Sequence, residues 1–217
     1  MNSQTLQPDK TESLFTFIYG LSIFTVAYNL IEGLVSVYWG IADKTLTLFG
    51  FGADSFIELI SGFGIIHMIN RLRKFGDDKR GEFEKTALKI TGYSFYGLVG
   101  TLIISSTYNL IKGNVPETTI TGVFIAIISI VVMAILVYYK LKIGKTLNSD
   151  AIIADANCTK VCIYMSVTLL ISSALYEFTH FKYLDIIGSL VIAYFSYQEG
   201  KECFEKAISD KNCGCKH

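Results

Sequence analysis

The chain has 217 residues, of which 51% are hydrophobic and only 18% are charged, and its mean hydropathy is +0.44. Soluble domains average about 25% charged residues, so this composition is shifted toward that of membrane proteins. The 19 basic and 19 acidic residues balance each other, which argues against a nucleic-acid partner.

Six apolar segments are each long enough to cross a membrane as a helix, because a bilayer core of about 30 Å takes roughly 20 helical residues. In chain order they cover residues 14–38, 46–70, 90–111, 119–139, 153–176 and 183–203. The fourth segment contains FIAIISIVVMAILVYY, which is apolar on every side and does not suit an amphipathic helix of a soluble bundle. The sequence therefore predicts an all-α integral membrane protein with six transmembrane helices.

The short polar connections between these segments are unevenly charged. Fifteen of the 19 Lys and Arg residues fall on the side that holds both termini, whereas the other side has only Lys44, Lys112 and Lys182. Basic residues mark the cytoplasmic side of a membrane protein. We therefore expect both termini in the cytoplasm, with the plasma (inner) membrane of a prokaryote as the location.

The predicted organisation has three parts. A cytoplasmic N-terminal tail covers residues 1–13, the six-helix transmembrane domain covers 14–203, and a short cytoplasmic tail with Cys and His residues covers 204–217. The polar, partly acidic start is followed by an apolar run too long for a signal-peptide core, so no cleaved signal is expected. No separate soluble domain is expected either.

Ionisable side chains within a membrane span are costly and mark candidate functional sites. In the second span, Asp54 and Glu58 are four residues apart, so both lie on one face of a helix. Two neighbouring carboxylates repel unless a cation lies between them, which favours a site for a divalent cation. The alternative is pairing with a basic residue of another helix, for which Lys160 is the evident intramembrane cation.

Cys158 and Cys162 repeat the same spacing in the fifth span. A buried cysteine can simply be a small apolar residue, but these two together with Asp54 and Glu58 would make four ligands. A tetrahedral set of sulfur and oxygen donors suits Zn²⁺ and softer d¹⁰ ions better than Mg²⁺ or Ca²⁺. Glycines that flank Asp54 and Glu58 are expected to let the second and fifth spans approach closely; they are Gly50, Gly52, Gly62 and Gly64.

Other polar residues in the spans are candidates to orient the ligands or to relay protons, with helix capping and interhelical hydrogen bonding as the alternatives. They are Asn29, Glu32, Asp155 and, at the outer end of the sixth span, Asp185. In the tail, Cys213, Cys215 and His217 could capture a soft metal ion, or belong to a reduced, unstructured end. No catalytic residue is predicted.

Three stretches resemble the transmembrane domain of the cation diffusion facilitator (cation efflux) family: NLIEGLVSVYWGIADKTLTLFGFGADSFIELISG, SDAIIADANCTKVCIYMS and YLDIIGSLVIAYFSYQEGKECFEKAISD. The resemblance implies a metal site near the bilayer midplane with two ligands from the second span and two from the fifth. These positions fall on Asp54, Glu58, Cys158 and Cys162. Two cysteines in place of the family's usual His and Asp on the fifth span make the implied site softer.

The resemblance also implies a homodimer. Members of the family usually carry a cytoplasmic ferredoxin-like domain that senses metal and holds the dimer together. This sequence leaves no room for such a domain, so we expect a short form, with the Cys/His tail as a substitute sensor.

The expected function is secondary active export of a divalent transition-metal cation, Zn²⁺ or a thiophilic ion such as Cd²⁺, by proton antiport. The expected partners are thus membrane lipid, the transported cation and protons, and no prosthetic group is expected. Protons compete with metal because thiols and carboxylates must be deprotonated to bind it. One alternative is a membrane-embedded metal or thiol sensor without transport. The other is an intramembrane thiol oxidoreductase, which ranks last because cysteines four residues apart on one helix have poor disulfide geometry.

Overall fold

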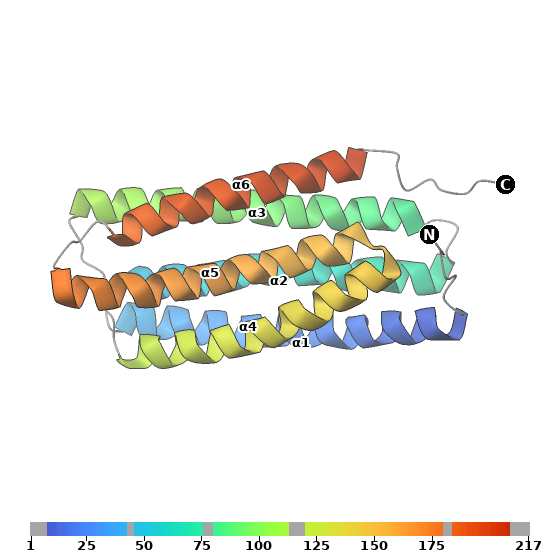
Figure 1. Cartoon of the computed structure of the whole chain (residues 1–217), viewed down its shortest axis with the longest axis horizontal. Coiled ribbons are helices and arrows are strands. Elements are labelled where there is room, and N and C mark those ends of the chain that lie inside the picture. The colour runs from blue at the N-terminus through green and yellow to red at the C-terminus, as the bar shows by residue number, and fades with distance from the viewer. Residues whose placement is uncertain (1–7, 43–45, 76–79, 113–119, 180–183, 209–217) are drawn as a thin grey trace.

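The computed structural model describes residues 8–42, 46–75, 80–112, 120–179 and 184–208. Within these ranges the chain forms six long helices, α1 to α6 (Figure 1). Their bounds are α1 Pro8–Ala42, α2 Leu46–Phe75, α3 Arg80–Lys112, α4 Ile120–Leu147, α5 Asp150–Thr179 and α6 Leu184–Ile208. The all-α class and the number of helices are therefore as predicted.

The helices form one elongated bundle in which successive helices run in opposite directions (Figure 1). Helix α2 contacts α1, α3 and α5, while α4 packs on α1 and α5, and α6 packs on α3 and α5. In Figure 1, α5 lies over α2 and runs antiparallel to it. This arrangement puts the two helices that carry the candidate metal ligands side by side.

Four of the described helices are long and apolar enough to cross a membrane by length and composition. The qualifying segments are Thr11–Trp39, Phe51–Phe75, Arg80–Lys112 and Gly122–Leu147. Segments of α5 and α6 do not meet the same criterion among the described residues. Both helices carry several charged side chains, among them Asp155 and Lys160 in α5, which lower their apolar character.

Most helices continue beyond the predicted spans. Helix α1 begins at Pro8 inside the predicted N-terminal tail, and α6 extends to Ile208 inside the predicted C-terminal tail. Helix α3 begins at Arg80 instead of residue 90, and α4 ends at Leu147 instead of residue 139. The reason is that the length of an apolar run reflects the thickness of the hydrocarbon core, whereas a helix ends only where local stop signals occur in the sequence.

The connection between α4 and α5 is much shorter than the gap between the predicted spans over residues 119–139 and 153–176. Only Asn148 and Ser149 separate the two helices. Asn148 has a φ of 49°, a left-handed conformation that asparagine tolerates better than most residues. The N–H of Ser149 donates to the carbonyl of Gly144 at 2.9 Å, which closes the end of α4. Lys140, which the predicted span over 119–139 leaves in the connection, therefore lies inside α4.

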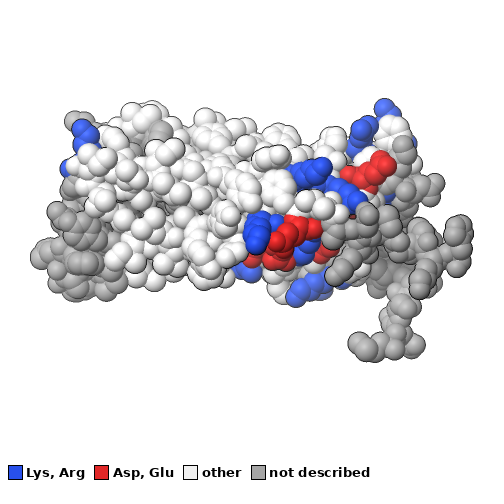
Figure 2. Space-filling view, turned by 90° about the horizontal axis from the view of Figure 1, so that it is seen from above, with Lys and Arg blue, Asp and Glu red and all other residues white. Residues whose placement is uncertain are grey.

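Charged side chains gather toward one end of the bundle, and a broad uncharged surface covers most of the remaining length (Figure 2). Helix α1 begins and α6 ends at this same end (Figure 1). An ion pair between Lys206 Nζ and Asp150 Oδ1, 3.7 Å apart, also links α6 to the start of α5 there. An uncharged band of this kind is what a membrane-embedded surface requires.

Candidate metal site between helices α2 and α5

The first contact of the candidate site joins a thiol and a carboxylate from different helices. Cys162 Sγ of α5 donates a hydrogen bond to Asp54 Oδ2 of α2 at 2.9 Å. Both side chains are buried, with 2% of Asp54 and 4% of Cys162 exposed. Two of the four predicted ligands, 108 residues apart in the chain, are therefore direct neighbours.

A second contact fixes the register of the two antiparallel helices. Ser61 Oγ of α2 donates to Asp155 Oδ1 of α5 at 2.8 Å. Ser61 lies seven residues after Asp54, and Asp155 lies seven residues before Cys162, a spacing of about two helical turns on each helix. The equal spacing means that α2 and α5 stay in step between the two contacts.

Glu58 and Cys158 lie between these two contacts, each four residues along its helix from the Asp54–Cys162 pair. They therefore occupy the same level of the α2–α5 interface. The side chain of Cys158 is 2% exposed and lies within electrostatic range of Glu58 and Asp54. The structure thus brings all four predicted ligands to one stretch of this interface.

Glu58 is the residue whose surroundings most clearly call for a cation. It is 1% exposed, and both carboxylate oxygens are buried without a hydrogen-bond partner in the described part of the chain. A buried carboxylate without a partner is strongly disfavoured in a low-dielectric interior. A bound cation would supply the missing interaction.

The four side chains do not form a ready-made coordination sphere. Among the described residues, no three His, Cys, Asp or Glu side chains are close enough together to hold a metal ion. The thiol of Cys162 is instead hydrogen-bonded to Asp54. Binding a metal here would require the loss of that proton and changes of side-chain rotamer.

A buried ion pair adjoins this site and was not predicted. Lys140 Nζ of α4 lies 2.8 Å from Asp155 Oδ2 of α5, and neither side chain is exposed. Lys160, the evident intramembrane cation in the sequence, is only partly buried. A signal for Lys140 was present in the sequence, because it continues the three-and-four residue spacing of the buried side of α4; that side is formed by Ala126, Ser129, Met133, Leu136, Lys140, Ile143 and Leu147.

Glu32 and Asn29 lie on the buried side of α1. Glu32 Oε1 accepts a hydrogen bond from Tyr28 at 3.0 Å, and its Oε2 accepts one from Ser55 of α2 at 3.1 Å. Asn29 is fully buried, and its amide has no hydrogen-bond partner among the described residues. Glu32 is therefore hydrogen-bonded to Ser55, the residue next to Asp54, whereas Asn29 has no such link among the described residues.

The flanking glycines serve other interfaces than the predicted one. A Cβ on Gly52 would lie 2.9 Å from the carbonyl oxygen of Gly33, so this glycine allows α1 to approach α2 closely. Gly62 also faces α1, and Gly64 faces α3. The expectation that these glycines bring α2 to α5 was therefore wrong for all three. The surroundings of Gly50 are outside the described part of the chain.

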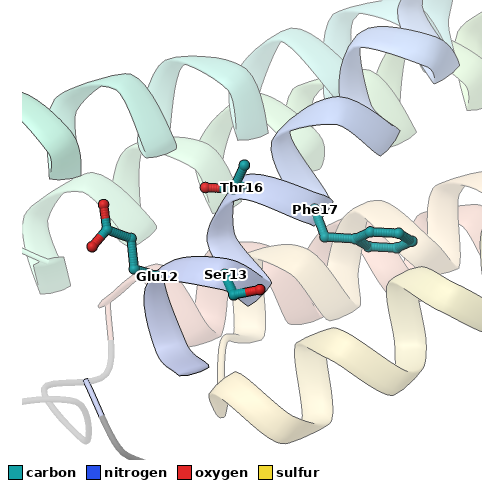
Figure 3. A pocket seen from close by; sticks show the side chains of 4 residues that line it. All are labelled: Glu12, Ser13, Thr16 and Phe17. Carbon is teal, nitrogen blue, oxygen red and sulfur yellow. The ribbon is translucent and has the colours of Figure 1, made fainter. Parts of the chain in front are cut away.

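The remaining predicted residues are not tested by contacts. Asp185 lies in the first turn of α6, but its side chain is outside the described part. Cys213, Cys215 and His217 lie outside the described residues altogether. A separate shallow pocket at the start of α1, shown in Figure 3, is lined by Glu12, Ser13, Thr16 and Phe17 and includes none of the candidate ligands.

Comparisons with known proteins agree with this architecture. The family model of the cation efflux transmembrane domain matches residues 22–210. The chain is 27% identical over 180 residues to the uncharacterized transporter MJ0449 of Methanocaldococcus jannaschii, covering 79% of this chain and 62% of that protein. It is 25% identical over 199 residues to the manganese efflux system protein MneP of Bacillus subtilis, covering 87% of this chain and 66% of MneP.

The chain therefore spans slightly less than two thirds of the length of these two relatives. The family match covers most of the six-helix bundle and all four candidate ligands. Together with the apolar helices, it confirms the predicted resemblance and a multi-pass location in the plasma membrane. The chain belongs to the family of cation efflux transmembrane domains.

Proposed function

We propose that this protein exports a divalent transition-metal cation from the cytoplasm and that Asp54, Glu58, Cys158 and Cys162 bind the ion. The observation that carries the proposal is the Asp54–Cys162 contact between α2 and α5. One turn away lies the carboxylate of Glu58, which has no hydrogen-bond partner within the described ranges. A divalent cation would offset the cost of burying these carboxylates. Membership of the cation efflux family supports the same class of function and a transporter instead of an enzyme.

The donor set favours a borderline or thiophilic ion. Thiolates prefer Zn²⁺ and softer ions, whereas carboxylates alone suit Mg²⁺, Ca²⁺ and Mn²⁺. Two thiols beside two carboxylates therefore favour Zn²⁺ or Cd²⁺. The relative MneP is named for manganese efflux, so Mn²⁺ is the competing substrate that the experiment must include.

Proton exchange follows from the chemistry of the ligands. The Cys162 thiol donates a hydrogen bond to Asp54, so its sulfur carries a proton. A metal ion that binds to this sulfur displaces the proton, so binding becomes weaker as pH falls. We propose that external protons release the metal and that helix movements around the fixed site alternate its access to the two sides.

The test is metal flux into proteoliposomes under an imposed pH gradient, with Zn²⁺, Cd²⁺ and Mn²⁺ compared. The wild type should transport Zn²⁺ or Cd²⁺ better than Mn²⁺, and a Cys158→Ser/Cys162→Ser variant should lose that flux because hydroxyls are poor ligands for these ions. Cys203→Ser is the matched control, since Cys203 is equally buried but lies in α6.

Flux of the softer ions that survives the double substitution would contradict the role of the cysteines. Flux that does not change when an ionophore dissipates the pH gradient would contradict proton antiport. Metal binding without any flux would favour a sensor. The homodimer that the family resemblance implies is tested separately, by the mass of the purified protein in nanodiscs.

A further inference from the structure

Both oxygens of the Asp155 carboxylate are occupied by partners from other helices. Lys140 Nζ of α4 lies 2.8 Å from Oδ2, and Ser61 of α2 donates to Oδ1 at 2.8 Å. Lys140 also donates to Thr159 Oγ1 at 2.9 Å, and Ser61 exchanges a hydrogen bond with Thr91 of α3 at 3.0 Å. These contacts hold Asp155 in one place within the bundle.

Asp155 lies next to the candidate metal site. It precedes Cys158 by three residues and Cys162 by seven, so the three side chains share one face of α5. Asp155 and Cys158 are within electrostatic range of each other, and Lys140 is within range of Glu58 and Cys158. Asp155 is therefore a third carboxylate at the edge of a site with two carboxylates and two thiols.

A third carboxylate would change which ions the site prefers. Carboxylate ligands suit harder ions such as Mn²⁺, whereas thiolates suit Zn²⁺ and Cd²⁺. If Asp155 turned toward the metal, oxygen donors would outnumber sulfur donors. Its ion pair with Lys140 opposes that movement, because breaking it would leave a buried ammonium without its counter-ion.

We propose that Lys140 determines the metal preference of this protein by holding Asp155 in an ion pair, which keeps a third carboxylate away from the transported ion. This inference rests on the proposed function and adds a residue from α4 to it. Lys140 acts through Asp155 and does not touch the metal, so it is a positioning residue. A purely structural ion pair would instead affect stability and leave the metal preference unchanged.

The test uses four forms of the full chain in nanodiscs: wild type, Lys140→Met, Asp155→Asn and the double variant. The affinities for Cd²⁺ and Mn²⁺ are measured by competition with a fluorescent chelator, and their ratio is compared. Lys140→Met should shift the ratio toward Mn²⁺ by about ten- to hundredfold, the range typical of changes to residues that orient metal ligands. Asp155→Asn and the double variant should keep the wild-type preference, because neither contains a third carboxylate.

An unchanged ratio in Lys140→Met would overturn the proposal, and so would a shift that persists in the double variant. If Lys140→Met does not fold, Lys140→Ala replaces it, since it also removes the ammonium that holds Asp155; the same shift is expected there. Wild-type protein that binds neither ion would contradict the proposed function itself. Metal binding with an unchanged ratio contradicts only the role of Lys140.

Discussion

At the scale of single residues, Glu58 has the least compensated charge in the α2–α5 interface. Both of its oxygens are buried without a partner in the described part of the chain, while Asp54 accepts a hydrogen bond from Cys162 and Asp155 contacts both Lys140 and Ser61. Such residues are kept at a cost in stability when function requires them. Neutralising Glu58 should therefore make the protein more stable in the absence of metal and reduce the stabilisation that metal binding provides.

We predict that Glu58→Gln raises the Tm of the metal-free protein, because an uncharged amide costs less to bury than an unpartnered carboxylate. The same substitution should abolish the stabilisation by Cd²⁺ or Zn²⁺, which for a ligand at 100 times its Kd amounts to about 2.7 kcal/mol. Thermal unfolding with and without metal measures both effects. Glu12→Gln is the control, since Glu12 is exposed, and a full metal response in Glu58→Gln would show that Glu58 is not a ligand.

The sequence was informative about some of these residues and not about others. Asp54, Glu58, Cys158 and Cys162 could be selected because their spacing within each helix is visible in the chain, although their role as ligands stays a prediction. Because Lys140 directly follows an apolar run, the sequence predicts that it lies in a loop. Its partner, Asp155, is 15 residues away on the next helix, and no pattern within one helix indicates such a pair.

At the scale of helices, the contact between α1 and α2 depends on two glycines. A Cβ on Gly52 would lie 2.8 Å from Val37 Cγ2 and 2.9 Å from the carbonyl oxygen of Gly33. Both distances are too short for ordinary packing, so any side chain at residue 52 would push the helices apart. The hydrogen bond from Ser55 to Glu32, one turn further along α2, depends on the same close approach.

We predict that Gly52→Ala lowers the free energy of unfolding by about 1–3 kcal/mol, the usual cost of overpacking. Gly20→Ala is the matched control in α1, because nothing lies within 4 Å of its added Cβ; its effect should stay within about 0.5 kcal/mol. Denaturation of both variants in the same detergent measures the difference. Equal stabilities would mean that α1 and α2 are not in close contact at this point.

The outer limits of the helices could be predicted less well than their existence. Apolar runs predict where a helix is embedded, but α3 begins about three turns before its run and α4 continues about two turns beyond its run. The α4–α5 turn depends on local chemistry at Asn148 and Ser149, which a general expectation of a polar loop does not capture. The glycines of α2 were recognised as packing positions, but their partners could not be predicted.

At the scale of the whole molecule, the gathering of charge at one end of the bundle (Figure 2) predicts its orientation in the membrane. The start of α1, the end of α6 and the α4–α5 turn lie at that end (Figure 1). The α3 residue Lys112 lies at the opposite end. The cytoplasmic assignment of the charged end is a prediction that labelling can test.

We predict that a membrane-impermeant maleimide labels Lys112→Cys in intact cells but labels Lys145→Cys only after permeabilisation. Both positions are exposed in the bundle, so the difference should reflect the side of the membrane and not burial. The parent protein, treated in the same way, corrects for labelling of native cysteines. The opposite pattern would invert the predicted topology and with it the direction of export.

The sequence alone determined the membrane class, the number of helices, the family resemblance and the four candidate ligands. These properties follow from apolar length, from spacing within one helix and from short motifs, all of which are local. Only the tertiary structure decided that Asp54 contacts Cys162 and that α2 and α5 keep the same register as far as the contact between Ser61 and Asp155. It also decided that Lys140 is buried in an ion pair. The physical reason is that helices in lipid are held together by specific side-chain contacts between distant parts of the chain, and the partner in such a contact is not encoded in the pattern of either helix alone.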